Sequence, residues 1–324
     1  MRTLILYIVV ILNLSGFYHC QAINSTNVFG VNQQIVDKIK KNGLWEPMEL
    51  SENPFKGWTQ KALQQLCGLL PSAANTKSSS IILKNSDQMK AYPSFNGTLP
   101  INFDLRKKWP TCIAPVKDQG NCGSCWAFPT ADVLGDTRCI IQFKPKVVVQ
   151  LSPQDLVSCD ANDNGCYGGT FSGAFSYLTG VGISTDSCIP YTSGNGVVPS
   201  CPASCVNSSE PMIKYRCNLA FYFYSNYSYG MKLWLYTTGP MAISMYVYDD
   251  FFSYKSGIYT RVSTNYAGAH AIKLIGYGYD KKNKINYWIC QNSWGRGWGM
   301  QGFFNIKEGE VGIDQEAYSC LPMN

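Results

Sequence analysis

The stretch QGNCGSCWAF, residues 119–128, joins a glycine-containing turn to the start of a helix that we expect over residues 124–139. Cys125 lies at the N-terminal end of this helix, where the positive end of the helix dipole lowers the pKa of a thiol. Because the thiolate is the reactive form of cysteine, this placement makes Cys125 a candidate nucleophile. The alternative is that Cys125 belongs to a structural disulfide, as most of the other cysteines do.

Histidine is scarce in this chain, which contains two. His19 lies in an N-terminal segment that we expect to be removed, so the mature protein would keep His270. His270 occurs in AGAHAIKLIGYG, residues 267–278, at the start of an apolar strand. A lone histidine beside a strand is more often a satisfied core residue. In a chain that also has a candidate nucleophile, His270 is the candidate base.

A third motif, QNSWGRGWG at residues 291–299, supplies a partner for that imidazole. The side chain of Asn292 can accept a hydrogen bond from an imidazole N–H and so hold the ring in position. Trp294 can screen the same hydrogen bond from water. Cys125, His270 and Asn292 together predict nucleophilic catalysis.

These motifs resemble those of the papain family of cysteine peptidases, whose signature is a Cys-Gly-Ser-Cys-Trp run with distant histidine and asparagine. The resemblance runs from about Leu99 to the C-terminus. It implies that Cys125 is the nucleophile, His270 the general base and acid, and Asn292 the residue that orients the imidazole. It also implies that Gln119 and the Cys125 backbone N–H form the oxyanion hole.

The resemblance extends to substrate binding. Gly168 and Gly169 match the segment whose backbone pairs with the substrate chain, although Tyr167 stands where asparagine is usual. Glu316 aligns with a glutamate at the base of the pocket for the second residue before the scissile bond, where a carboxylate could pair with Arg or Lys. The alternative for Glu316 is an ordinary surface position. Trp294 completes the expected binding residues.

Several segments resemble the cathepsin B branch of the family, namely residues 99–112, 254–259 and 302–307. Cathepsin B releases dipeptides because an occluding loop with two adjacent histidines binds the substrate's C-terminal carboxylate. The corresponding stretch here, residues 189–200, contains no histidine. We therefore expect an endopeptidase. The alternatives are a cathepsin B-like peptidyl-dipeptidase and a catalytically inactive binding homologue.

The secondary-structure pattern predicts an α+β fold in the papain-like arrangement, with a helical left part, a β-barrel-like right part and the cleft between them. The front half of the body reads as helix and loop. From about Phe221 onward, short alternating segments with glycine turns are typical of strands. These strand segments are residues 242–248, 256–262, 271–279, 285–294 and 302–307.

The N-terminal third reads as a removable leader. Residues 1–22 have a positive start, a short apolar run and a small residue at the end, which predicts a signal peptide rather than a membrane anchor. Residues 23–98 contain helical patterns at 31–41 and 59–70 and a polar stretch at 72–80. We interpret 23–98 as a propeptide, the alternative being an ordinary subdomain, and 99–324 as the peptidase domain.

Fourteen cysteines in a chain with a signal peptide indicate a disulfide framework and the secretory pathway, with a lysosome, a vacuole or the exterior as the destination. The resemblance implies the pairs Cys112–Cys139, Cys122–Cys166, Cys159–Cys201 and Cys188–Cys205. Cys217, Cys290 and Cys320 remain unassigned, and at least one of them should stay a thiol. Sequons at Asn24, Asn96, Asn207 and Asn226 are candidate glycan acceptors.

The bulk composition narrows the range of partners. The net charge is +6 without a clustered basic stripe, so we expect no nucleic-acid binding. No later stretch is long and apolar enough for a membrane span, and no ligand cluster implies a metal or an organic cofactor. The expected partners are protein and peptide substrates, the chain's own propeptide as inhibitor, and cystatin-like inhibitors.

Pro129 is unusual, because proline inside a helix clashes with the carbonyl four residues back, here that of Cys125.

Overall fold

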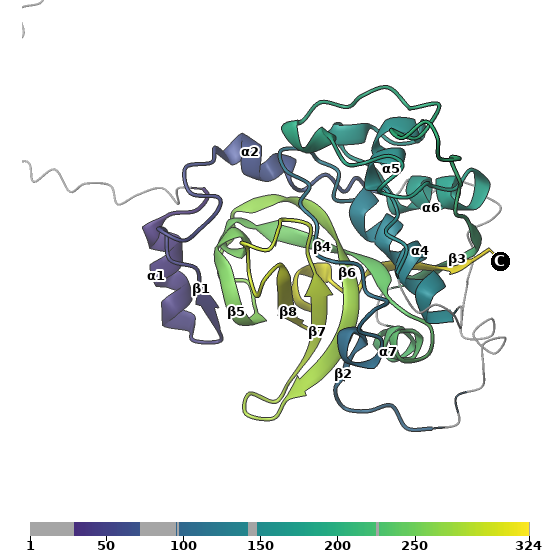
Figure 1. The fold of residues 1–324 in the computed structure, drawn as a ribbon. Helices are drawn as coiled ribbons and strands as arrows, with labels where there is room; N and C mark the ends of the chain where they lie inside the picture. The colour runs from purple at the N-terminus through teal and green to yellow at the C-terminus, as the bar shows by residue number, and fades with distance from the viewer. Residues whose placement is uncertain (1–28, 72–94, 96, 142–147, 225–226, 324) are drawn as a thin grey trace, which may run out of the picture.

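The computed structural model describes residues 29–71, 95, 97–141, 148–224 and 227–323, which form a helical part and a sheet part (Figure 1). The α+β class is confirmed. The predicted signal peptide, the polar stretch at 72–80 and the sequons at Asn24, Asn96 and Asn226 lie outside the described residues. The helices of the body are α3 (Leu105–Lys108), α4 (Ala127–Ile141), α5 (Pro153–Cys159), α6 (Phe171–Gly180) and α7 (Ser228–Thr237).

The sheet has the strand order β1-β5-β8-β7-β6-β4-β9-β3, with β2 paired to β6. Its longest strand, β6, carries His270 and lies between β4 and β7. In these ladders His270 is opposite Met245, and Lys273 is opposite Gln291, so the predicted imidazole lies near the strand end that leads into Asn292. The strands are β1 (Trp45–Pro47), β2 (Phe103–Asp104), β3 (Cys217–Tyr224), β4 (Met241–Tyr248), β5 (Tyr254–Tyr259), β6 (Tyr266–Asp280), β7 (Ile285–Gln291), β8 (Phe303–Lys307) and β9 (Glu316–Pro322).

Helix α4 packs between the other helices and the sheet and is buried along nearly its whole length. It begins at Ala127, so the predicted start at residue 124 was three residues too early. Pro129 is therefore the third helical residue, where a backbone N–H needs no partner within the helix. The carbonyl of Cys125 precedes the helix, so the expected clash with the proline ring does not arise.

The segment before the body adds two helices and an edge strand to this fold. Asn32 caps α1 (Gln33–Asn42) by accepting from the Ile35 N–H, and Gly43 ends it with a φ of 66°. Strand β1 pairs antiparallel with β5 and so docks the segment on the sheet (Figure 1). Helix α2 (Gln60–Gln65) stops short of the predicted end at residue 70 because Gly68 and Leu69 enter extended β-bridges.

Five disulfides join ten of the described cysteines. Four of them are the pairs that the resemblance implies, and the fifth joins Cys217 to Cys320 on the neighbouring strands β3 and β9. The described cysteines without a disulfide are Cys67, Cys125 and Cys290. Within the described ranges, no helix is both long enough and apolar enough to cross a membrane.

Candidate active site

Cys125 lies two residues before the first residue of α4, in a loop that the Cys122–Cys166 disulfide anchors. The Gly123 N–H also donates to the Cys166 carbonyl at 3.0 Å. Cys125 is fully buried, because the leader segment covers it. Burial raises the pKa of its thiol to about 12, although backbone N–H groups, among them that of Ala271, favour the thiolate. The prediction of a lowered pKa is therefore wrong for this covered form.

His270 is held by the asparagine that the sequence suggested. Its Nε2 lies 2.8 Å from Asn292 Oδ1. Nδ1 makes no hydrogen bond of good geometry among the described residues, but the backbone carbonyl of Leu66 in the leader also interacts with the imidazole. The Trp294 ring packs on the imidazole with centroids 4.7 Å apart. Because Oδ1 can only accept, it selects the tautomer with the proton on Nε2 and leaves Nδ1 as a base. Burial lowers the pKa of His270 to about 4, so the imidazole is neutral in this form.

The side chain of Gln119 is buried and fixed at both ends. Its Oε1 accepts from the Ser293 hydroxyl at 2.7 Å. Its Nε2 donates to the Cys122 carbonyl at 2.8 Å and to the Leu66 carbonyl at 3.0 Å. The amide predicted to bind the oxyanion thus already binds a carbonyl from the leader segment.

The leader continues from Leu66 along both walls of the cleft. The Gly169 N–H donates to the Gly68 carbonyl at 3.0 Å, and the Leu70 N–H donates to the Gly169 carbonyl at 2.8 Å. On the opposite wall, the Leu69 N–H donates to the Ala269 carbonyl at 3.2 Å. The segment 66–70 therefore occupies the cleft. Sequence reasoning missed this contact, although the run LCG at 66–68 already stood out.

The two glycines of the cleft wall have physical reasons to be glycine. Gly168 has a φ of 115°, and an added Cβ would come within 2.7 Å of the Gly68 carbonyl oxygen. At Gly169 an added Cβ would lie 2.5 Å from the Trp126 ring. A side chain at either position would collide with the chain in the cleft or with the core beneath it.

Glu316, the remaining predicted binding residue, is the first residue of β9 and is half-buried. In the ladder it lies opposite Tyr224 of β3. Among the described positions, no group of three or more His, Cys, Asp or Glu side chains is arranged as a metal site.

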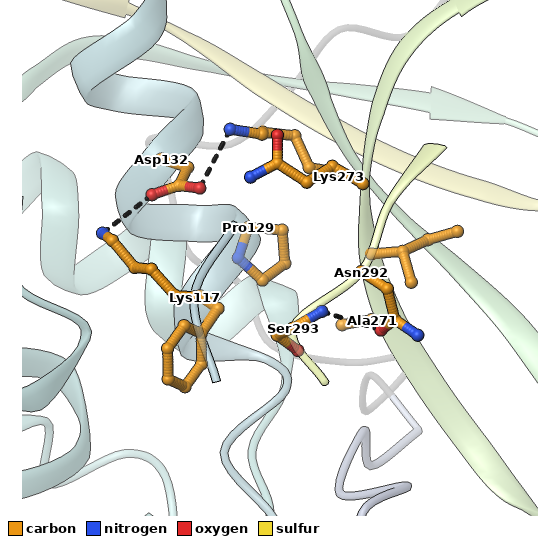
Figure 2. Close-up of a pocket in the computed structure, with 10 residues that line it drawn as sticks. Lys117, Pro129, Asp132, Ala271, Lys273, Asn292 and Ser293 are labelled. Carbon is orange, nitrogen blue, oxygen red and sulfur yellow. Dashed lines mark hydrogen bonds and ion pairs between the residues drawn. The ribbon is translucent and has the colours of Figure 1, made fainter. Parts of the chain in front are cut away.

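A small cavity of about 10 Å³ lies behind the candidate catalytic residues, between α4 and β6 (Figure 2). Lys273, three residues after His270, donates to Asp132 Oδ2 and Asp136 Oδ2, each at 2.9 Å. Lys117 donates to Asp132 Oδ1 at 3.0 Å. Two buried carboxylates and two lysines thus join the helical part to the strand that carries His270. No sequence motif pointed to this network.

Comparisons with known proteins agree with this geometry. The family model described as papain family cysteine protease matches residues 99–321. A cathepsin B-like protein of Giardia intestinalis, CP3, is 40% identical over 220 residues, which are 67% of this chain and 73% of that protein. Cathepsin B of Dictyostelium discoideum is 33% identical over 254 residues, 72% of this chain and 78% of its own length.

Solved structures of precursors resemble the chain over nearly its whole length. The procathepsin B S9 structure from Trypanosoma congolense has a TM-score of 0.79 and 30% identity, and the match covers 91% of this chain and 99% of that one. A procathepsin L2 structure from Tenebrio molitor has a TM-score of 0.72 and 26% identity, with 89% and 87% covered. The chain therefore belongs to the papain family of cysteine proteases, is cathepsin B-like, and has the architecture of a precursor.

Proposed function

We propose that this chain is the zymogen of a cysteine endopeptidase in which Cys125 and His270 form the catalytic pair. The observation that carries the proposal is the 2.8 Å contact between His270 Nε2 and Asn292 Oδ1, which leaves Nδ1 as the nitrogen that the asparagine does not hold. The backbone N–H of Ala271, the next residue, interacts with the Cys125 thiol. An imidazole oriented in this way can take a proton from the thiol.

The reaction would proceed in two halves. The Cys125 thiolate attacks the peptide carbonyl carbon, and the oxyanion accepts hydrogen bonds from Gln119 Nε2 and the Cys125 N–H. His270 donates its proton to the leaving amine, which leaves an acyl-enzyme. His270 then takes a proton from water, the hydroxide attacks the thioester, and the thiolate returns.

We propose that residues 23–98 are the propeptide and that they inhibit by occupying this site. The Leu66 carbonyl takes the Gln119 donor that the oxyanion would need, and burial keeps the thiol and the imidazole neutral. Leu99, the expected start of the mature body, is half-buried between exposed neighbours, which suits cleavage there. The five disulfides support a secretory route, with a lysosome, a vacuole or the exterior as the proposed destination.

The stretch 189–200 supports endopeptidase rather than dipeptidase activity. It contains no histidine to bind a C-terminal carboxylate. Its backbone is tied to the body, since the Thr192 and Ser193 N–H groups donate to Gln154 Oε1 at 2.8 and 3.0 Å. The Asn121 N–H donates to the Gly194 carbonyl at 2.7 Å. A cleft without an occluding loop would admit long substrates and cystatin-like inhibitors.

We also propose that Glu316 lies in the pocket for the second residue before the scissile bond. A carboxylate there would tolerate arginine alongside apolar residues. The support is the alignment of Glu316 with the pocket glutamate of cathepsin B. Replacing it by Gln should lower kcat/KM for an arginine peptide more than for a leucine peptide.

The test compares two internally quenched peptides after the purified zymogen has been activated at acid pH. One has arginine second before the cut in a long sequence, and the other presents a free C-terminal dipeptide. Cleavage of the first alone, lost in Cys125→Ser, would support the endopeptidase. Strong dipeptide release would favour the peptidyl-dipeptidase. No cleavage of either peptide, after confirmed propeptide removal, would favour the inactive homologue.

A further inference from the structure

A second cavity, of about 260 Å³, adjoins the candidate active site beside Gln119. Side chains of the leader bound it on one side, among them Phe55, Trp58 and Leu66. The body supplies Asp118, Gly194 and Trp294 on the other side. The leader side chains there are apolar, whereas the body contributes a carboxylate.

The position of this cavity along the cleft follows from the path of the leader. Leu66 reaches Gln119, and Leu69 and Leu70 continue away from the cavity toward Gly169. If the proposed function holds, the residues before the scissile bond pair with Gly169 and the scissile carbonyl binds at Gln119. The cavity then receives the residues that follow the scissile bond.

The carboxylate of Asp118 makes no ion pair within the described part of the chain. Its side chain is exposed and accepts from the Gly120 N–H at 2.9 Å, and no described lysine or arginine forms an ion pair with it. Lys117, which adjoins Asp118 in the sequence, and Arg296, which lies two residues after Trp294, have other partners. Lys117 donates to Asp132, and Arg296 donates to Gln301 at 3.3 Å. The negative charge is therefore available to a ligand.

Trp294 supplies an aromatic surface next to that charge. In the precursor the tryptophan is 4% exposed, and the Phe55 ring meets it edge-on with centroids 5.4 Å apart. Removal of the leader would uncover the part of Trp294 that Phe55 contacts. A carboxylate beside an aromatic ring suits a long basic side chain, which can pair with one and lie over the other.

We propose that Asp118 and Trp294 form a subsite for an arginine or lysine side chain in the first two substrate positions after the scissile bond. Arginine should bind better than lysine, because its planar guanidinium both stacks on a ring and pairs with a carboxylate. Glutamate in the same positions is disfavoured by repulsion from Asp118. This proposal rests on the proposed peptidase activity and adds a substrate preference to it.

The test uses the activated mature enzyme and three quenched peptides that share leucine as the second residue before the cut. They carry Arg, Ala or Glu in both positions after it. We expect kcat/KM to be about tenfold higher for the Arg peptide than for the Glu peptide at low salt. In Asp118→Asn, whose amide oxygen still accepts from the Gly120 N–H, the ratio should fall to about twofold. Added salt should lower the ratio in the wild type.

A matched control removes one carboxylate at a position away from the cavity. Asp280 is half-buried at the end of β6 and accepts from the Lys282 N–H of its own turn, so Asp280→Asn should leave the Arg-to-Glu ratio unchanged. Cys125-dependent cleavage with equal rates for the three peptides, or with the same ratio in Asp118→Asn, would overturn the subsite and leave the peptidase standing. Cleavage of none of the peptides, after confirmed leader removal, would overturn both.

Discussion

At the scale of single residues, the site depends on how the imidazole is oriented. Asn292 Oδ1 accepts from His270 Nε2 and from the Ser293 N–H, each at 2.8 Å, so its position is fixed by its own backbone. The Trp294 ring packs on the same imidazole. The ring is thus held by a polar contact on its edge and an apolar contact on its face, which fixes the direction of Nδ1.

Replacing Asn292 by Ala should lower kcat by about 100-fold, since a misplaced catalytic group costs about that much. KM should change little, because the asparagine acts through the imidazole rather than on the substrate. Steady-state kinetics of the activated enzyme measure the split. Asn286→Ala, at an exposed position of strand β7, which ends one residue before Asn292, is the matched control and should keep wild-type kinetics. A change confined to KM would contradict the orienting role.

His270 should also make closure of the leader depend on pH. Burial lowers its pKa from the ordinary 6.5 to about 4, so the covered form excludes the protonated imidazole. Above pH 6.5 the imidazole is neutral in both forms, so it does not change the stability of the covered form relative to the open form. As the pH falls from 6.5 to 4, the covered form loses stability relative to the open form, by about 3 kcal/mol at the limit.

The measurement is the rate at which added mature enzyme cuts the leader of Cys125→Ser precursor between pH 4 and 7. A second precursor, Cys125→Ser with His270→Gln, lacks the titrating ring. The ratio of the two rates cancels the pH dependence of the added enzyme, and it should rise as the pH falls below 6.5. A ratio that is flat with pH would exclude His270 as the titrating group.

At the scale of elements, β6 is joined to α4 by charge. Lys273 is 1% exposed. It contacts Asp132 (Figure 2) and Asp136 across the boundary between the sheet and the helices. Burial raises the pKa of Asp136 to about 6, while the two lysines keep the pKa of Asp132 below its usual value. Each carboxylate needs its lysine, because a buried charge without a partner is costly.

Lys273→Met should therefore destabilise the precursor by about 3 to 5 kcal/mol, because it leaves buried carboxylates without their ion-pair partner. Adding Asp136→Asn should restore part of the lost stability, because it removes one of the buried charges that lack a partner. Chemical denaturation of the two variants measures the difference. Lys307→Met, on an exposed position of β8, should be close to neutral. Equal stabilities for Lys273→Met and the double variant would mean that the carboxylate is not the source of the cost.

The sequence predicted the local parts of this site better than the parts that depend on distant contacts. His270, Asn292 and Gln119 lie in short motifs, and the structure brings His270 and Asn292 into direct contact. Lys273 and Asp132 are 141 positions apart, and no local pattern joins them. The end of α2 was also misplaced, because Gly68 and Leu69 give up helical hydrogen bonds for contacts with the cleft walls. The helix propensity of residues 59–70 carries no information about the cleft walls, which are formed by residues far away in the sequence.

At the scale of the whole molecule, the leader and the body are built as one unit. Strand β1 extends the sheet at β5, and residues 66–70 fill the cleft at the other end of the leader. Between these contacts, Phe55 packs against Phe252 and Trp294 of the body. The leader thus completes an apolar surface that its removal would expose, together with the proposed catalytic residues.

The disulfide framework leads to a thiol count for the mature body. Twelve cysteines follow Leu99, and five disulfides use ten of them. Cys125 and Cys290 remain as thiols. Burial raises the pKa of the Cys290 thiol well above its usual value, so this thiol should stay unreactive while the protein is folded.

The activated enzyme should accordingly release one equivalent of chromophore from a thiol reagent in its native state and two when denatured without reductant. In Cys125→Ser the native count should fall to zero and the denatured count to one, whereas Cys290→Ser should keep the native count and lower the denatured count to one. A denatured count of four would mean that Cys217 and Cys320 are not joined. That bridge links β3 to β9, whose first residue is Glu316, so the same count bears on how the proposed substrate pocket is held.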